Sequence, residues 1–317
     1  MVSALERGVL IGQAVVEVPG RCGNLVYGIM GDLKKGGYYV SIPCPVDSFC
    51  GVSVSLFENN HDSSNNNGNG ATIVGPEDCL ETVEAVTRTL GYLGRVGLSA
   101  KISVTSANSR SKGMRNSASN IAAAIGATVR ASGENISPSE IASLAGSIEP
   151  SNVMLPGLAL VEHREVLSFQ ELGSPPPIKV VALDFGYDLE PSNNQDQLPS
   201  DDSILSAIYD LRRAIATGKP WLFGRGATLV AEAYQCNCSS KKTRALMKRV
   251  TSFAESVNAV GVMMPDRSVI GVLLSGDPPP AMREILTSAR CAFPEVGIGC
   301  FNLVGGGLIY PEDPEAA

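Results

Sequence analysis

The sequence lacks the features of membrane, secreted and nucleic-acid-binding proteins. No apolar run approaches the ~20 residues that cross a bilayer, and no charged start followed by an apolar segment occurs at Met1. With a net charge of -7 and arginines that stand singly or in pairs, the chain offers no positive field for a phosphate backbone. We therefore expect a cytoplasmic protein that binds neither membranes nor nucleic acids.

The eight cysteines also lack the spacing of a zinc site. No C-x-x-C pair occurs, and Cys236 and Cys238 have no histidine nearby that would complete a metal site. In a chain without an export signal, such thiols are expected to be reduced and buried. With 44% hydrophobic and 18% charged residues over 317 positions, the chain can bury a full core without disulfide or metal staples.

The first hundred residues alternate like the strands of a sheet. The β-branched segments, bounded by Gly, Pro and Asp, cover 8–19, 37–43 and 49–58. The turn-rich segment 59–70 has little apolar surface and predicts a surface loop. A helix over 76–94, a strand over 97–108 and a short helix over 137–146 follow, the last with a capping box from Ser137 to Glu140.

The sharpest change of composition lies at LGSPPPIKVVALDFGYDLE (172–190), where a stiff proline run passes into an apolar strand. We place the domain boundary there, with domains of residues 1–174 and 175–317. The second domain is expected to hold helices and strands over 201–217, 224–235, 242–257, 259–264, 268–274, 279–292 and 296–303. This order lacks a parallel βαβ rhythm, so the α+β class is predicted, in two layers.

A polar stretch, SKGMRNSASN (111–120), connects the strand over 97–108 to an alanine-rich helix. The apolar positions of that helix predict a start close to Ser117. Free N–H groups and the positive end of the helix dipole lie at such a start, and Ser111, Lys112 and Ser119 add hydroxyls and a cation. The stretch is a candidate anion site, with a simple helix cap as the alternative.

This stretch resembles the glycine loop P-x-x-x-G-L-x-S-S-A of the GHMP kinases (galactose, homoserine, mevalonate and phosphomevalonate kinases), which wraps the triphosphate of ATP. The match runs from Ser109 to Ala118, with Gly113, Met114 and Ser117 on pattern. VPGRCGNLVYG (18–28) is similar to the first motif of the family, P-x-R/S-x-x-N-L, which lies against the phosphoryl acceptor.

Within the superfamily, the sequence is most similar to the L-threonine kinases of cobalamin biosynthesis. Four segments carry the likeness in the same order: PGRCGNL, CPVDSF (44–49), SKGMRNSASN and EPSNVMLPGLALVEH (149–163). The resemblance implies an N-terminal domain like ribosomal protein S5 domain 2 and a C-terminal ferredoxin-like domain. It also implies transfer of the γ-phosphoryl group of Mg-ATP to the hydroxyl of L-threonine or a related hydroxy amino acid.

The same resemblance assigns the site. The nucleotide would be held by Ser109, Ser111, Lys112, Gly113, Met114, Arg115, Asn116, Ser117 and Ser119. Mg²⁺ would be bound by Ser117 and Glu149, and the catalytic site would comprise Asn24, Asp47, Lys112 and Asn152. Asp47 is a candidate partner for a substrate ammonium, with a turn cap as the alternative. The sequence leaves open whether the protein forms a homodimer.

Several positions depart from the threonine-kinase pattern. Three amides stand where carboxylates are usual: Asn24, Asn120 and Asn152. Two larger residues replace small ones in the loop: Arg115 and Asn116. In the place of the third family motif (261–276), Pro265, Asp266 and Arg267 replace small residues. An Asn cannot act as a general base. Two alternatives to an active L-threonine kinase therefore stay open: a catalytically degenerate homologue that binds nucleotide or metabolite and acts through a partner, and a GHMP kinase with another acceptor.

Overall fold

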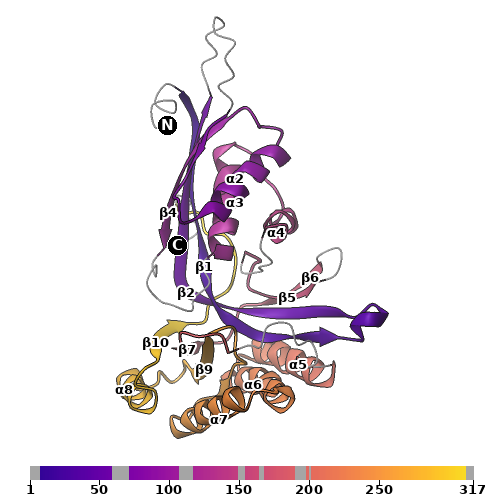
Figure 1. Ribbon diagram of the computed structural model, residues 1–317, viewed down its shortest axis with the longest axis vertical. Coiled ribbons are helices and arrows are strands. Elements are labelled where there is room, and N and C mark those ends of the chain that lie inside the picture. Colours follow the sequence, from indigo (N-terminus) through magenta and orange to yellow (C-terminus); the bar gives the residue numbers. More distant parts are fainter. Residues whose placement is uncertain are drawn as a thin grey trace, which may run out of the picture.

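Two long antiparallel strands run through most of the molecule. The computed structural model describes residues 8–58, 71–106, 117–148, 154–163, 168–189, 198–199 and 201–311. In it β1 (Val9–Met30) and β2 (Tyr38–Glu58) pair along nearly their whole length and are joined through a short 3-10 turn at Leu33–Lys35. The pair bends midway, so its two parts belong to two different layers (Figure 1).

This hairpin is the centre of the first sheet, whose other strands pair with both of its parts. Its strand order is β3-β4-β2-β5-β6, and β1 pairs with β2 outside this path. The added strands are β3 (Ile73–Val74), β4 (Ser99–Ser106), β5 (Leu158–His163) and β6 (Ser168–Gly173). Three helices lie on one side of its upper part (Figure 1): α2 (Leu80–Tyr92), α3 (Ser117–Ala131) and α4 (Pro138–Gly146).

Helix α3 is buried on almost every side because small residues line it. Ala122, Ala123 and Ala124 are fully buried, so α3 packs closely against both β1 and α2. The predicted start of this helix near Ser117 is confirmed. The predicted capping box is also confirmed, since Ser137 and Glu140 exchange hydrogen bonds at the start of α4.

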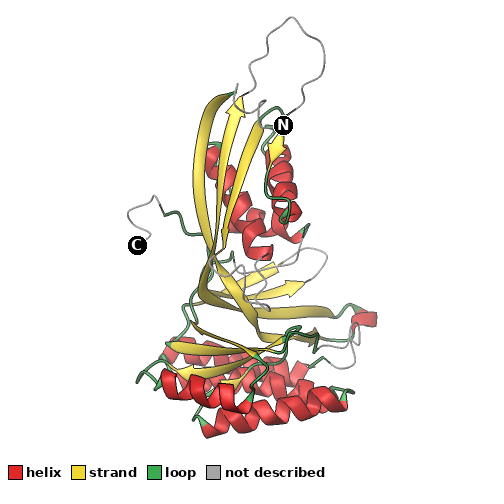
Figure 2. Cartoon of the chain, turned by 60° about the vertical axis from the view of Figure 1, so that its left-hand side comes forward, coloured by secondary structure: helices red, strands yellow, loops and turns green. Residues whose placement is uncertain are grey.

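The second sheet is antiparallel, with the order β10-β7-β9-β8. Its strands are β7 (Ile178–Asp184), β8 (Gly261–Val262), β9 (Val269–Ser275) and β10 (Gly297–Asn302). The helices of this half are α5 (Asp201–Thr217), α6 (Pro220–Asn237), α7 (Lys241–Ser256) and α8 (Met282–Ala292). Figure 2 shows the sheet between these helices and the lower part of the hairpin.

The first half has longer strands than predicted. The strand predicted over 8–19 continues through the first motif at 18–28, and the two segments predicted at 37–43 and 49–58 are one strand. The strand accommodates its glycines and proline through register shifts after Pro19, after Arg21 and after Asn24. Strands β5 and β6 were not predicted.

The packing joins the two halves of the chain. One core cluster fills the upper layer, whereas the other combines Leu25 and Ile42 of the hairpin with Val181, Phe223 and Leu273 of the second half. The chain passes from the first sheet to the second between Gly173 and Ile178. The division at 174/175 stays a prediction, because part of the first half shares its core with the second.

Residues 303–311 return from the second sheet to the first half. Val304 donates to the carbonyl of Pro45 at 3.0 Å, and the backbones of Glu17 and Ile309 exchange bonds of 2.9 and 2.8 Å. The glycine run at 305–307 lies against the first half of the chain, where Gly306 forms a β-bridge with Gly157, whose φ is +64°. A β-carbon at Gly305 would lie 3.2 Å from the Cα of Gly157, so small residues are needed on both sides.

Candidate active site between the two sheets

The first motif lies on a bulge of β1. Arg21 pairs with Pro45 and Asn24 with Pro43, so β1 holds one residue more than β2 over this stretch. Gly23 supplies the bulge with a φ of +71°. A β-carbon there would lie 3.1 Å from Cβ of Asp266, so glycine is required both for the backbone angle and for this contact.

The bulge turns Arg21 and Asn24 toward Asp266, which lies in the turn between β8 and β9. Asn24 Nδ2 donates to Asp266 Oδ2 at 3.1 Å, and Arg21 Nη2 lies 3.3 Å from the same oxygen. All three groups are mostly buried, with exposed fractions of 9% for Asn24 and of 13% and 14% for the side chains of Arg21 and Asp266. The first motif therefore meets the place of the third motif, 242 residues further along the chain.

The neighbouring titratable groups are neutral at pH 7. Burial, and to a lesser degree the charge of Arg21, lower the pKa of His163 below its ordinary value. His163 Nε2 lies 2.9 Å from the hydroxyl of Ser41. Burial, followed by the charge of Asp266, raises the pKa of Cys22 to about 12. Among the described residues, the ion pair at this point is formed by Arg21 and Asp266.

The start of α3 is fastened to β1 beside the same bulge. Ser119 is fully buried, and its hydroxyl donates to the carbonyl of Pro19 at 2.8 Å. Pro19 precedes Arg21 by two residues, so the N-terminus of α3 lies next to the motif strand. The hydroxyl of Ser119 is used in this contact and positions the helix.

The first turn of α3 fits an anion. It carries no acidic residue, so its N–H groups and the positive end of its dipole are not offset by a carboxylate. Ser117 begins the helix and is half-buried. Asn120, in the same turn, is 6% exposed, and its Oδ1 finds no hydrogen-bond donor within the described ranges. Oxygens of this type suit Mg²⁺, which also takes oxygens from phosphates and water.

The other predicted loop and metal residues lie outside the described residues: Ser109, Ser111, Lys112, Gly113, Met114, Arg115, Asn116, Glu149 and Asn152. Within the residues that are described, no group of three or more His, Cys, Asp or Glu is placed to hold a metal ion. The assignments of the nucleotide, magnesium and catalytic residues therefore stay predictions.

Asp47 lies at the end of the bulged region and is exposed. Its two carboxylate oxygens accept from the backbone N–H of Asn302 at 2.8 Å and from Nδ2 of the same residue at 2.5 Å. Lys179 in turn donates to Oδ1 of Asn302 at 2.6 Å. In this structure Asp47 links β2 to the end of β10.

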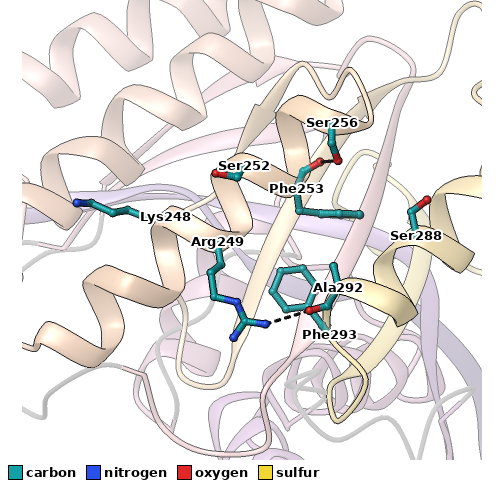
Figure 3. A pocket seen from close by; sticks show the side chains of 8 residues that line it. All are labelled: Lys248, Arg249, Ser252, Phe253, Ser256, Ser288, Ala292 and Phe293. Carbon is teal, nitrogen blue, oxygen red and sulfur yellow. Dashed lines mark hydrogen bonds between the residues drawn. The ribbon is translucent and has the colours of Figure 1, made fainter.

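A separate pocket of about 430 Å³ lies between α7 and α8 (Figure 3). Its lining residues are Lys248, Arg249, Ser252, Phe253, Ser256, Ser288, Ala292 and Phe293. Arg249 donates to the carbonyl of Ala292 at 3.0 Å and lies over the ring of Phe293, and Ser256 donates to the carbonyl of Phe253. The pocket takes no residue from β1, β2 or α3, so it is not part of the candidate site.

Sequence reasoning missed the two charged residues of the cluster around Asn24: Asp266, which accepts from Asn24, and Arg21, which pairs with Asp266. Arg21 lies inside the first motif, and Asp266 was noticed only as a departure from the third motif. The signal available in the sequence was that departure, a carboxylate where small residues are usual. Its meaning depends on a contact between residues that are far apart in the chain.

Among the described helices, none combines the length and apolarity needed to cross a bilayer.

Comparisons with known proteins bear on the site as a whole. Residues 79–157 match the family model of the GHMP kinases N terminal domain, a range that takes in α2, β4, α3 and α4. An L-threonine kinase of Salmonella typhimurium is 26% identical over 271 residues, which cover 82% of this chain and 83% of that protein. The predicted resemblance to GHMP kinases is confirmed.

Solved structures agree on the fold. Mevalonate diphosphate decarboxylase from Staphylococcus aureus gives a TM-score of 0.65 at 13% identity over 95% of this chain and 98% of that one. A complex of MDDEF with MVAPP, AMPPCP and magnesium gives 0.64 at 13% identity over 94% and 98%. Homoserine kinase from Cytophaga hutchinsonii gives 0.60 at 16% identity over 93% and 96%. The predicted GHMP kinase fold is confirmed.

Proposed function

We propose that this protein is an ATP-dependent small-molecule kinase. Its fold is that of the GHMP kinases, and residues 79–157 match the N-terminal domain of that family. The acceptor that we propose is the hydroxyl of L-threonine or a related hydroxy amino acid. The observation that carries the proposal is the hydrogen bond from Ser119 to the carbonyl of Pro19, because it brings an anion-binding helix start to the strand that holds Arg21 and Asn24.

The proposed reaction needs positioning more than covalent help from the protein. The transition state of phosphoryl transfer is loose, so the nucleophilic hydroxyl requires little activation, and an amide at position 24 is compatible with the reaction. The start of α3 and the residues before it would hold the phosphates through N–H groups and Lys112. Ser117 and Glu149 would hold Mg²⁺, which neutralises phosphate charge when bound. Asn24 orients the acceptor beside Asp266.

The proposed cofactors, ATP and Mg²⁺, draw support from the fold relative solved with AMPPCP and magnesium. The fold alone does not assign the reaction, because mevalonate diphosphate decarboxylase shares it. The choice of acceptor is supported by the sequence relation to an L-threonine kinase.

The test is ADP formation from ATP and Mg²⁺ with a panel of hydroxy amino acids. L-Threonine or a close relative should be turned over, and no ADP with any member of the panel would refute the proposal. Lys112→Ala should weaken ATP binding by roughly tenfold or more, because it removes a charge-assisted contact to phosphate. Lys248→Ala is the matched control, since Lys248 lies in the pocket between α7 and α8 and should leave ATP affinity unchanged.

A second candidate is a homologue that binds nucleotide without turning it over. The observation in its favour is that Asn24 and Asn120, both buried, carry amides where carboxylates are usual in L-threonine kinases. A rise in melting temperature with Mg-ATP, together with no ADP from any acceptor, would favour this candidate over the kinase.

A further inference from the structure

Arg21 and Asp266 form a charged pair with much unused bonding capacity. A guanidinium carries five N–H donors, yet Arg21 has a single described partner, at 3.3 Å, and its buried Nε has none in the parts of the chain that are described. On Asp266, both Asn24 and Arg21 contact Oδ2, and no described side chain donates to Oδ1. Of these atoms, Nε of Arg21 is buried without a partner in the described parts of the chain, a condition that is rare for a buried polar atom.

The same protein contains an ion pair of the ordinary structural kind. Arg225 donates to Asp210 through both Nε, at 2.6 Å, and Nη2, at 2.5 Å, so that each carboxylate oxygen receives one bond. This bidentate geometry is the one that fixes two side chains to each other. The contact between Arg21 and Asp266 differs from this geometry, because it is a single contact and is longer, at 3.3 Å.

The charge of the site also selects among ligands. Arg21 supplies one positive charge and Asp266 one negative charge, while His163 and Cys22 are neutral at pH 7. A ligand with one ammonium and one carboxylate complements this arrangement. A sugar carries no charge that could bind either group, and a dianionic acid would add repulsion from Asp266.

We propose that Arg21 and Asp266 together recognise the α-amino acid group of the acceptor, with Arg21 binding its carboxylate and Asp266 its ammonium. This inference rests on the proposed function and names the recognition elements within it. Binding exchanges the 3.3 Å contact for two contacts to the ligand, and Asn24 stays hydrogen-bonded to Asp266. Asp47 is less suited to the ammonium because Asn302 occupies both of its oxygens.

The experiment compares three acceptors in wild-type protein and two variants. The acceptors are L-threonine, 3-hydroxybutyrate, which lacks the ammonium, and 1-aminopropan-2-ol, which lacks the carboxylate. Wild-type protein should prefer L-threonine over each analogue by about 10- to 100-fold in kcat/KM, the range expected for hydrogen bonds to charged groups. Asp266→Asn should abolish the preference over 3-hydroxybutyrate alone, and Arg21→Gln the preference over 1-aminopropan-2-ol alone.

The controls separate recognition from stability. Asp210→Asn removes a carboxylate from the bidentate pair and should leave both preferences intact. KM for ATP should stay within about twofold of wild type in every variant, because no variant touches the proposed phosphate site. If a variant fails to fold, the preferences of the wild-type protein still decide, since equal kcat/KM for all three acceptors overturns the proposal.

Two further outcomes are informative. Equal losses for all three acceptors in both variants would mean that the pair is structural, and would overturn the inference while the proposed kinase stands. If the wild type forms no ADP at all, the proposed function fails, and the pair is then tested by melting temperature. A rise with L-threonine but with neither analogue supports the pair, and no rise with L-threonine overturns it.

Discussion

Replacing Gly23 by alanine tests the geometry on which the site depends. Gly23 has a φ of +71°, and an added β-carbon would lie 3.1 Å from Cβ of Asp266. Gly133 offers a matched control, since its φ is +72° and its β-carbon would meet nothing within 4 Å. The two substitutions therefore share the backbone penalty and differ in the contact with Asp266.

The magnitudes follow from these two terms. A left-handed backbone costs an L-residue about 1–2 kcal/mol, which is the loss in unfolding free energy expected for Gly133→Ala. In Gly23→Ala, Asp266 must also shift to make room, and we expect this to break its hydrogen bond from Asn24, which contributes about 1.5–3 kcal/mol as a bond to a charged group. The total is then about 2.5–5 kcal/mol. At about 2 °C per kcal/mol for a chain of this size, the melting temperature should fall by ~2–4 °C and ~5–10 °C respectively.

Scanning calorimetry of both variants measures the difference, and acceptor kinetics show whether it reaches the site. Gly23→Ala should also raise KM for the amino acid, whereas Gly133→Ala should not. Equal melting temperatures for the two variants would refute the close approach of Asp266 to the bulge.

Two other substitutions probe the surroundings of the site. Ser119→Ala should lower the unfolding free energy by about 1–3 kcal/mol and raise KM for ATP, because it leaves the buried carbonyl of Pro19 without its donor. Ser132→Ala is the control. It removes a bond to the carbonyl of Thr128 near the other end of α3 and should leave KM for ATP unchanged. The lowered pKa of His163 means that the unfolded chain takes up a proton first as the pH falls below the ordinary value of 6.5. Stability should therefore fall below that pH, by at most about 1.4 kcal/mol per pH unit from this group, and His163→Gln should remove that part of the slope in urea titrations.

The elements that could be predicted are those whose signal is local. Helix α5 covers the residues expected, 201–217, because its apolar periodicity and acidic start coincide. The start of α3 at Ser117 followed from the helical spacing of its apolar residues. Continuous strand through residues 18–28 could not be predicted, since Pro19, Gly20 and Gly23 usually end strands and here occupy register shifts set by pairing with β2.

The candidate site divides in the same way. Asn24 and the stretch before Ser117 could be proposed as site residues because their motifs are contiguous in the sequence. The contact between Asn24 and Asp266 depends on the turn between β8 and β9 reaching β1, and no local pattern around Asp266 predicts that contact. Asp47 was identified by its motif, but its engagement with Asn302 depends on the placement of β10 against β2.

The return of residues 303–311 to the first half affects how the chain folds during synthesis. A ribosome releases β1, β2 and α3 long before it adds this segment, since chains emerge from the N-terminus at about 5–20 residues per second. Until then, the backbone groups of Glu17, Pro45 and Gly157 lack the partners that they have in the finished protein. The first half is therefore completed only after the second has been made, and neither half is a natural unit for separate expression.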